Sequence, residues 1–219
     1  MTRNKSYGLS RRTETRLPHT RFVVFSEGLN TEPAYLTTLG NTLSRVLVKL
    51  KIFGGAGDPK TLADKALAFK KGSSGSGRRD ASSFEKNDQI WIMFDRDEHD
   101  KVKETIDNFK KAGIRVAYSN PCFELWLILH YEDFDRSYDR HKLQGHFEGL
   151  CESYSKKGNK KPDCNSFIGN VESAELRAQA MLARRRNENA EFGAPYTNVH
   201  ELTSAMRQAD QRQINSKKR

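Results

Sequence analysis

One stretch decides the fold class of this 219-residue chain: Gln89-Ile90-Trp91-Ile92-Met93-Phe94-Asp95-Arg96-Asp97. A short apolar run bounded by polar residues is typical of a strand that is buried on both faces. This run delivers two carboxylates, Asp95 and Asp97, at its C-terminal end. Residues two apart in an extended chain point the same way, so both carboxylates can address one ion.

A second run, Arg21-Phe22-Val23-Val24-Phe25-Ser26, delivers Glu27 directly before Gly28. In open α/β sheets, ligand sites form beyond the carboxyl ends of parallel strands. We therefore expect Glu27 to converge with Asp95 and Asp97. Packed carboxylates repel one another unless a cation lies between them, so the cluster predicts Mg²⁺ or Mn²⁺ as cofactor. In the alternative interpretation, each acidic residue is a solvated or capping carboxylate.

Strand-like and helix-like segments alternate along the first 120 residues. This alternation predicts right-handed crossovers and an α/β fold, with a mostly parallel four-stranded core sheet flanked by helices. Thr31 and Thr197 are expected to cap the helices that follow them. The expected strands are 21–27, 45–53, 89–95 and 114–118, and the expected helices begin at Thr31 and Asp58 and cover about 100–112, 121–132, 139–155, 166–188 and 197–212.

The same pattern predicts four parts of the chain. Residues 1–20 form a flexible basic arm and residues 21–131 the α/β catalytic core. Residues 132–212 form a helical extension that packs on the core, and 213–219 a basic tail. The Gly- and Ser-rich stretch 72–88 is expected to be a flexible basic loop.

Composition favours a polyanionic partner. The chain has 38 Lys and Arg against 28 Asp and Glu, a formal net charge of +10. Lys and Arg contacts to phosphate dominate nucleic-acid affinity, although a solvated basic surface would give the same count. The residues expected to hold a nucleic-acid backbone are Arg78, Arg79, Lys160, Lys161, Arg184, Arg185 and Arg186.

Location is predicted from what the sequence lacks. Three cysteines give no disulfide framework, which favours a reduced, cytoplasmic setting. No apolar stretch approaches the roughly 20 residues that span a bilayer, and the first residues contain no apolar signal region.

Five further polar residues are candidates for the site. Glu124 lies in an apolar helix, where a buried carboxylate is costly unless it is paired or bound to metal. His130, on the same segment, is either catalytic or an ordinary core histidine. Asn198 and His200 stand near a helix N-terminus, which favours anions, or simply begin a surface helix. Glu32 is already explained by the dipole of its own helix.

Other site classes are disfavoured. A zinc site made of His141, His146, Cys151 and Cys164 would need residues that do not share a helix face. The chain contains no phosphate-binding loop, no dinucleotide fingerprint and no serine-nucleophile elbow.

The order of strands, helices and acidic residues resembles a TOPRIM domain, the metal-binding module of topoisomerases, primases and OLD-type nucleases. Over about residues 20–205 the chain is more specifically similar to the RloB-like family. The motifs that carry this resemblance are Ser26-Glu27-Gly28 with Thr31-Glu32-Pro33, Phe94-Asp95-Arg96-Asp97-Glu98-His99, Asn120-Pro121-Cys122-Phe123-Glu124-Leu125-Trp126 and Thr197-Asn198-Val199-His200-Glu201-Leu202.

The resemblance implies a prokaryotic TOPRIM-like nuclease linked to antiphage defence, sometimes beside an ATPase partner that acts in trans. It implies metal binding by Glu27, Asp95 and Asp97. Glu124, His130 and His200 fall in the other motifs as candidate catalytic residues, and Asn198 as a candidate nucleic-acid contact.

The sequence therefore predicts a metal-dependent endonuclease, with RNA such as tRNA favoured as substrate and DNA as the alternative. Two rival interpretations remain open. The chain could be a non-catalytic nucleic-acid-binding or regulatory subunit, or a phosphatase with Asp95 as nucleophile. The position of Asp95 on the third strand disfavours the phosphatase.

Overall fold

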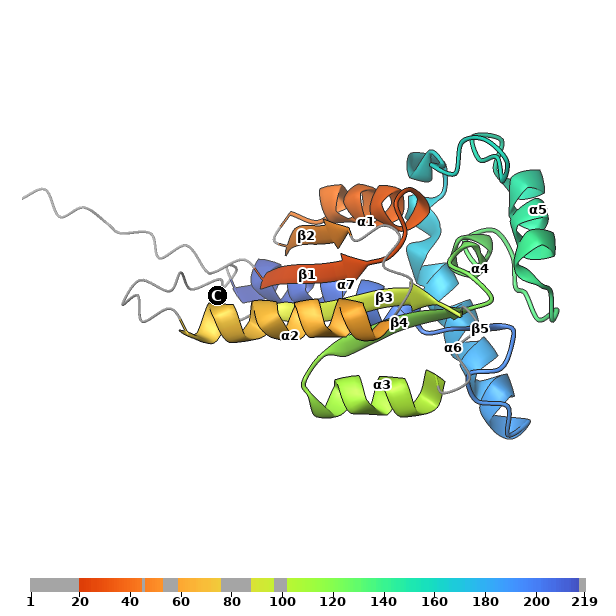
Figure 1. Cartoon of the computed structure of the whole chain (residues 1–219). Helices are drawn as coiled ribbons and strands as arrows, with labels where there is room; N and C mark the ends of the chain where they lie inside the picture. The colour runs from red at the N-terminus through yellow and green to blue at the C-terminus, as the bar shows by residue number, and fades with distance from the viewer. Residues whose placement is uncertain (1–19, 45, 53–58, 76–87, 97–101, 217–219) are drawn as a thin grey trace, which may run out of the picture.

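The computed structural model describes residues 20–44, 46–52, 59–75, 88–96 and 102–216. Within them, five strands form one sheet (Figure 1). The strands are β1 (Thr20–Ser26), β2 (Val46–Ile52), β3 (Gln89–Asp95), β4 (Arg115–Asn120) and β5 (Tyr196–Thr197). Four of the five are the strands expected from sequence, each within about two residues of its expected ends. The two-residue β5 was not expected.

The strand order is β2-β1-β3-β4-β5. β1, β2, β3 and β4 run parallel, and β5 pairs antiparallel with β4. The predicted α/β class with a mostly parallel sheet is therefore confirmed. The chain passes from β1 outward to β2 and then crosses back over β1 to β3, so the order reverses between β1 and β3. Such a reversal opens a crevice at the carboxyl ends of the two strands.

Helices cover both faces of the sheet (Figure 1). The face that carries Phe22 and Val24 packs against α1 (Thr31–Thr42), α4 (Glu124–Ile128), α6 (Val171–Asn187) and α7 (Val199–Ser216). The face that carries Val23 and Phe25 packs against α2 (Pro59–Gly75) and α3 (Val102–Lys111). Alternate residues of β1 thus enter different cores, as the period of two in a strand requires.

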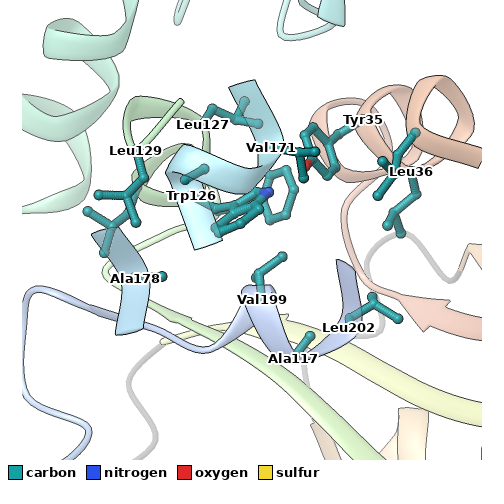
Figure 2. Packing of buried hydrophobic residues seen from close by; sticks show 14 of the residues in the cluster. Tyr35, Leu36, Ala117, Trp126, Leu127, Leu129, Val171, Ala178, Val199 and Leu202 are labelled. Carbon is teal, nitrogen blue, oxygen red and sulfur yellow. The ribbon is translucent and has the colours of Figure 1, made fainter. Parts of the chain in front are cut away.

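Trp126 stands at the centre of the larger core (Figure 2). Its indole ring is fully buried, and Tyr35 of α1 meets it edge-on with ring centroids 6.1 Å apart. Val171 of α6 and Val199 of α7 close around the same ring in Figure 2. Four elements are therefore fixed relative to one another by one large side chain.

The C-terminal half returns to the sheet. α5 (Arg140–Leu150), two 3₁₀ turns (Cys164–Ser166 and Ile168–Asn170) and α6 precede β5, and α7 then packs against β1, β2 and β4. Part of the expected helical extension thus completes the sheet and covers one of its faces.

Three local expectations are corrected. Thr31 does not cap α1, because Asn30 holds the cap position and the Thr31 hydroxyl donates instead to the Lys160 carbonyl, 2.8 Å away. α2 continues to Gly75, into the stretch expected to be a loop. α4 is regular only over Glu124–Ile128, which is shorter than the helix expected over 121–132.

Among the described helices, none combines the length and the apolar character needed to cross a membrane.

Candidate functional site

Two neighbouring strands deliver carboxylates to the same end of the sheet. Ser26 of β1 pairs with Met93 of β3, so Glu27 and Asp95 follow at almost the same level on adjacent strands. Both lie at the reversal of strand order, and α4 lies beyond the tips of β1 and β3 in Figure 1. The structure thus brings together the described part of the predicted acidic triad. The third member, Asp97, lies outside the described residues.

A pocket of about 140 Å³, here called the acidic pocket, occupies this end of the sheet. Three carboxylates line it, and they come from α1, β3 and α4. The lining residues are Gly28, Leu29, Asn30, Thr31, Glu32, Asp95, Phe123, Glu124, Arg140, Gln144 and Lys160.

Glu32 is the most perturbed carboxylate in the acidic pocket. Its side chain is buried, and its pKa is raised to about 7, mainly by burial and also by like-charge repulsion from Glu124 and Glu27. A Cβ atom on Gly28 would lie only 1.9 Å from Oε2 of Glu32. Any side chain at position 28 would therefore displace the Glu32 carboxylate, which occupies the space where a Cβ would lie.

Glu124 is buried but has two hydrogen-bond donors. Tyr154 Oη donates to Glu124 Oε1 at 2.6 Å, and Gln144 Nε2 donates to the same oxygen at 3.2 Å. These bonds offset the cost of burying a carboxylate. They also orient Glu124 toward the pocket from α4.

Asp95 faces a guanidinium group. Nη2 of Arg140, in the first turn of α5, lies 3.7 Å from Asp95 Oδ2. Arg140 also lowers the pKa of Glu32, against the larger effect of burial. The pocket is therefore lined by two cationic side chains, Arg140 of α5 and Lys160.

The donor chemistry of the acidic pocket fits a hard divalent cation, since carboxylate oxygens are the ligands that Mg²⁺ and Mn²⁺ prefer. Within the described residues, no three His, Cys, Asp or Glu side chains are grouped closely enough to hold a metal ion. The carboxylates that face the pocket, with Glu27 beside them, are the residues that could contribute ligands.

His130 does not line the acidic pocket. It is buried in the larger core, where the rings of Tyr35, Trp126 and Phe167 surround it with centroids 5.0–5.3 Å away. Its Nδ1 donates to the Trp126 carbonyl, and its Nε2 accepts from the Tyr35 hydroxyl, both at 3.1 Å. Burial lowers its pKa to about 4, so the ring is neutral. These are the contacts of a core histidine.

Asn198 and His200 lie at the start of α7. The Asn198 side chain accepts from the backbone N–H of Tyr118 at 2.7 Å and donates to the carbonyl of Val116 at 3.0 Å. Both of its polar groups are thus used to extend the ladder of β4. His200 is buried and its pKa is lowered to about 4, mainly by burial and further by Arg186. Neither side chain lines the acidic pocket.

The predicted basic residues divide into three groups. Arg78 and Arg79 lie outside the described residues. Lys160 lines the acidic pocket and Lys161 an adjoining cavity. The third group lies in the last turn of α6, where Arg186 is exposed and lowers the pKa of His200. Arg184 and Arg185 of the same turn form ion pairs with acidic neighbours, which are Asp133, Asp135 and Glu188.

Three residues that line the acidic pocket or contact its carboxylates are not indicated by the sequence. Arg140, Gln144 and Tyr154 reach Asp95 and Glu124 from a segment remote in the chain, and no local motif marks them. The sequence also explains Glu32 by the dipole of its own helix, which gives no sign that the side chain lines a pocket. Gly28, four residues before Glu32, is the sequence signal for the proximity of Glu32 to the end of β1, since a glycine leaves space for another side chain.

A family model described as RloB-like protein matches residues 22–206. No curated protein matches the chain, and no solved structure matches it.

Proposed function

The chain belongs to the RloB-like family, and we propose that it is a divalent-metal-dependent, TOPRIM-like nuclease that hydrolyses phosphodiester bonds. One observation carries the proposal. Carboxylates gather at the strand-order reversal between β1 and β3, and there burial and like-charge repulsion hold the pKa of Glu32 at about 7. Such an arrangement favours the binding of a cation, which relieves the repulsion between the carboxylates.

The proposed ligands of the cation are Glu27, Asp95 and Asp97. A bound Mg²⁺ or Mn²⁺ would supply stabilisation of the charge that develops on the phosphate oxygens. Glu32 and Glu124 line the same pocket and extend the acidic set beyond these three residues.

The protein's own residues have distinct proposed roles. Arg140 and Lys160 present cations at the pocket and would bind the phosphate. Tyr154 and Gln144 hold the Glu124 carboxylate in place, which makes them positioning residues. The catalytic assignment is confined to the acidic pocket, so His130 and His200 receive no part in it.

The proposed substrate is RNA such as tRNA, with DNA as the alternative, and the proposed setting is prokaryotic antiphage defence with an ATPase partner in trans. The net charge of +10 supports a nucleic-acid substrate.

The test is cleavage of end-labelled tRNA, single-stranded RNA and duplex DNA with Mg²⁺, with Mn²⁺ or with EDTA. We expect metal-dependent cuts that Asp95→Asn and Glu124→Gln each reduce at least about 100-fold. Asp107→Asn is the matched control, because Asp107 is exposed on α3. Equal cleavage by Asp95→Asn and wild type would overturn the assignment.

A non-catalytic regulatory subunit is the second candidate. Its supporting observation is that Asp95 and Glu124 already have protein partners in Arg140, Tyr154 and Gln144. Nucleic-acid binding without cleavage under every metal condition, also when an ATPase partner is added, would favour this candidate.

A further inference from the structure

A larger cavity adjoins the acidic pocket. It encloses about 450 Å³ between α1 and the segment 161–165, within the size range of small-molecule sites. Leu29 and Asn30 line both the cavity and the acidic pocket, so the two spaces share one wall. Of two consecutive lysines, Lys160 lines the acidic pocket and Lys161 lines the larger cavity.

The lining of the cavity combines apolar side chains with hydrogen-bonding groups. Pro33 and Pro162 face it from opposite segments, and Leu29 contributes an aliphatic side chain that is 63% exposed. Asn30 and Thr37 add amide and hydroxyl groups. A heterocycle with apolar faces and polar edges matches this lining.

Two hydrogen bonds fix the walls of the cavity. The Thr31 hydroxyl of α1 donates to the Lys160 carbonyl at 2.8 Å, which ties the two walls together. In the second wall, Asn165 Nδ2 donates to Asp163 Oδ1 at 2.9 Å. The cavity is therefore pre-formed.

We infer that this cavity receives the base of the nucleotide next to the phosphodiester that the acidic pocket binds, so the substrate is unpaired at that nucleotide. The inference rests on the proposed function. A base within a duplex is stacked and paired, and only a base that has left the stack can enter a concave site. One wall separates the two spaces, as expected for a phosphate and its attached nucleoside.

The test measures binding, so it does not depend on cleavage. The probes are fluorescently labelled single-stranded RNA hexanucleotides in Ca²⁺, one intact and the others with a single abasic position at each site in turn. We expect removal of the base at one position to weaken binding roughly tenfold, which corresponds to about 1.4 kcal/mol of binding free energy. A duplex of the same sequence should also bind more weakly.

The matched variants are Ala34→Met and Ala183→Met. Ala34 lines the cavity from α1, and methionine would fill part of it, whereas Ala183 is exposed on α6. Ala34→Met should weaken binding of the intact hexanucleotide roughly tenfold and abolish the penalty of the abasic position, because the base can then no longer enter the cavity. Ala183→Met should change neither the binding of the intact hexanucleotide nor the penalty of the abasic position.

The outcomes separate this inference from the proposed function. Binding of hexanucleotides with no dependence on any single base, or unchanged by Ala34→Met, would overturn the cavity assignment and leave the nuclease standing. Absence of binding to any nucleic acid would overturn both.

Discussion

Among the carboxylates of the acidic pocket, Glu32 has the pKa that the environment of the pocket shifts most. Its pKa of about 7 exceeds the ordinary value of 4.5 because the side chain is buried beside other carboxylates. Between these pH values the folded protein holds a proton that the unfolded chain releases. The free energy of unfolding contributed by Glu32 is therefore present at low pH and lost as the pH rises through 7.

Glu32→Gln should remove this pH dependence. The free energy of unfolding of the variant minus that of wild type should increase by about 2 kcal/mol from pH 5 to pH 8, because wild type loses the contribution of protonated Glu32. Urea denaturation at both pH values, without divalent cations, measures the difference. The control is Glu104→Gln, an exposed glutamate in the first turn of α3. A difference between Glu32→Gln and wild type that is the same at both pH values would contradict the burial of a protonated Glu32.

The contribution of His130 to the free energy of unfolding should depend on pH in the opposite direction. Its pKa of about 4 lies below the ordinary 6.5, so the unfolded chain takes up a proton in this window and the folded protein does not. Stability should fall as the pH drops from 6.5 to 4. His130→Phe keeps a ring but leaves the Tyr35 hydroxyl unpaired, so it should be less stable at pH 7 and lose less stability on acidification. Thermal unfolding across this range tests both effects.

Residue types at the strand ends were predictable, and their environments were not. The sequence indicates Glu27 and Asp95 because each follows an apolar run. It does not show that Glu32 is buried, since a glutamate in a first helical turn has the same local pattern whether it faces solvent or a pocket. His130 illustrates the same limit, because a histidine among apolar residues fits both a site and a core, and only its ring contacts place it in the core.

At the scale of elements, the turn between β1 and α1 determines the position of Glu32. Gly28→Ala would place a Cβ 1.9 Å from Glu32 Oε2 and 2.1 Å from Glu32 Cδ, so the carboxylate must move. Because the displaced group is the end of a flexible side chain, we expect the fold to persist and metal-dependent cleavage to fall about tenfold or more.

Gly149→Ala is the matched control for Gly28→Ala. A Cβ at Gly149 meets no atom within 4 Å, and the residue lies in α5. Alanine should stabilise the helix by about 0.5–1 kcal/mol without affecting cleavage. Thermal unfolding and the cleavage assay, applied to both variants, separate an effect on the pocket from one on stability. Equal cleavage by Gly28→Ala and wild type would show that the position of Glu32 is unimportant.

Long elements were predicted well because each carries its own period. β1, β2, β3 and β4 have apolar runs of strand length, and their alternation with helices gives a parallel sheet. β5 has two residues, too few to show a period, and it forms because Ser119 and Asn120 of β4 offer an edge. The packing of Arg140 against Asp95 depends on the path of the chain after α4, which no local pattern encodes.

At the scale of the whole molecule, the basic side chains differ in how far they are available to bind phosphate. Arg184 and Arg185 pair with Asp133 and Asp135, whereas Lys160 and Lys161 line the two cavities. Lys160→Gln with Lys161→Gln should weaken binding of single-stranded RNA and reduce the slope of log K against log[salt] by about 1.4, near 0.7 for each phosphate contact.

Arg184→Gln with Arg185→Gln is the comparison that tests this division. Loss of the ion pairs to Asp133 and Asp135 should lower stability by about 1 kcal/mol, since the pairs are partly exposed. The salt slope should stay near the wild-type value in the same titration. If the double arginine substitution reduces the salt slope as much as the double lysine substitution does, the RNA backbone also contacts α6.

The return of α7 to the sheet sets an order of events during synthesis. α7 packs against β1, β2 and β4, yet it is translated after all of them. The sheet face that carries Trp91, Met93 and Ala117 therefore has no complete cover while the ribosome is still producing the segment before α7. The nascent chain can therefore complete its larger core only after α7 has been translated.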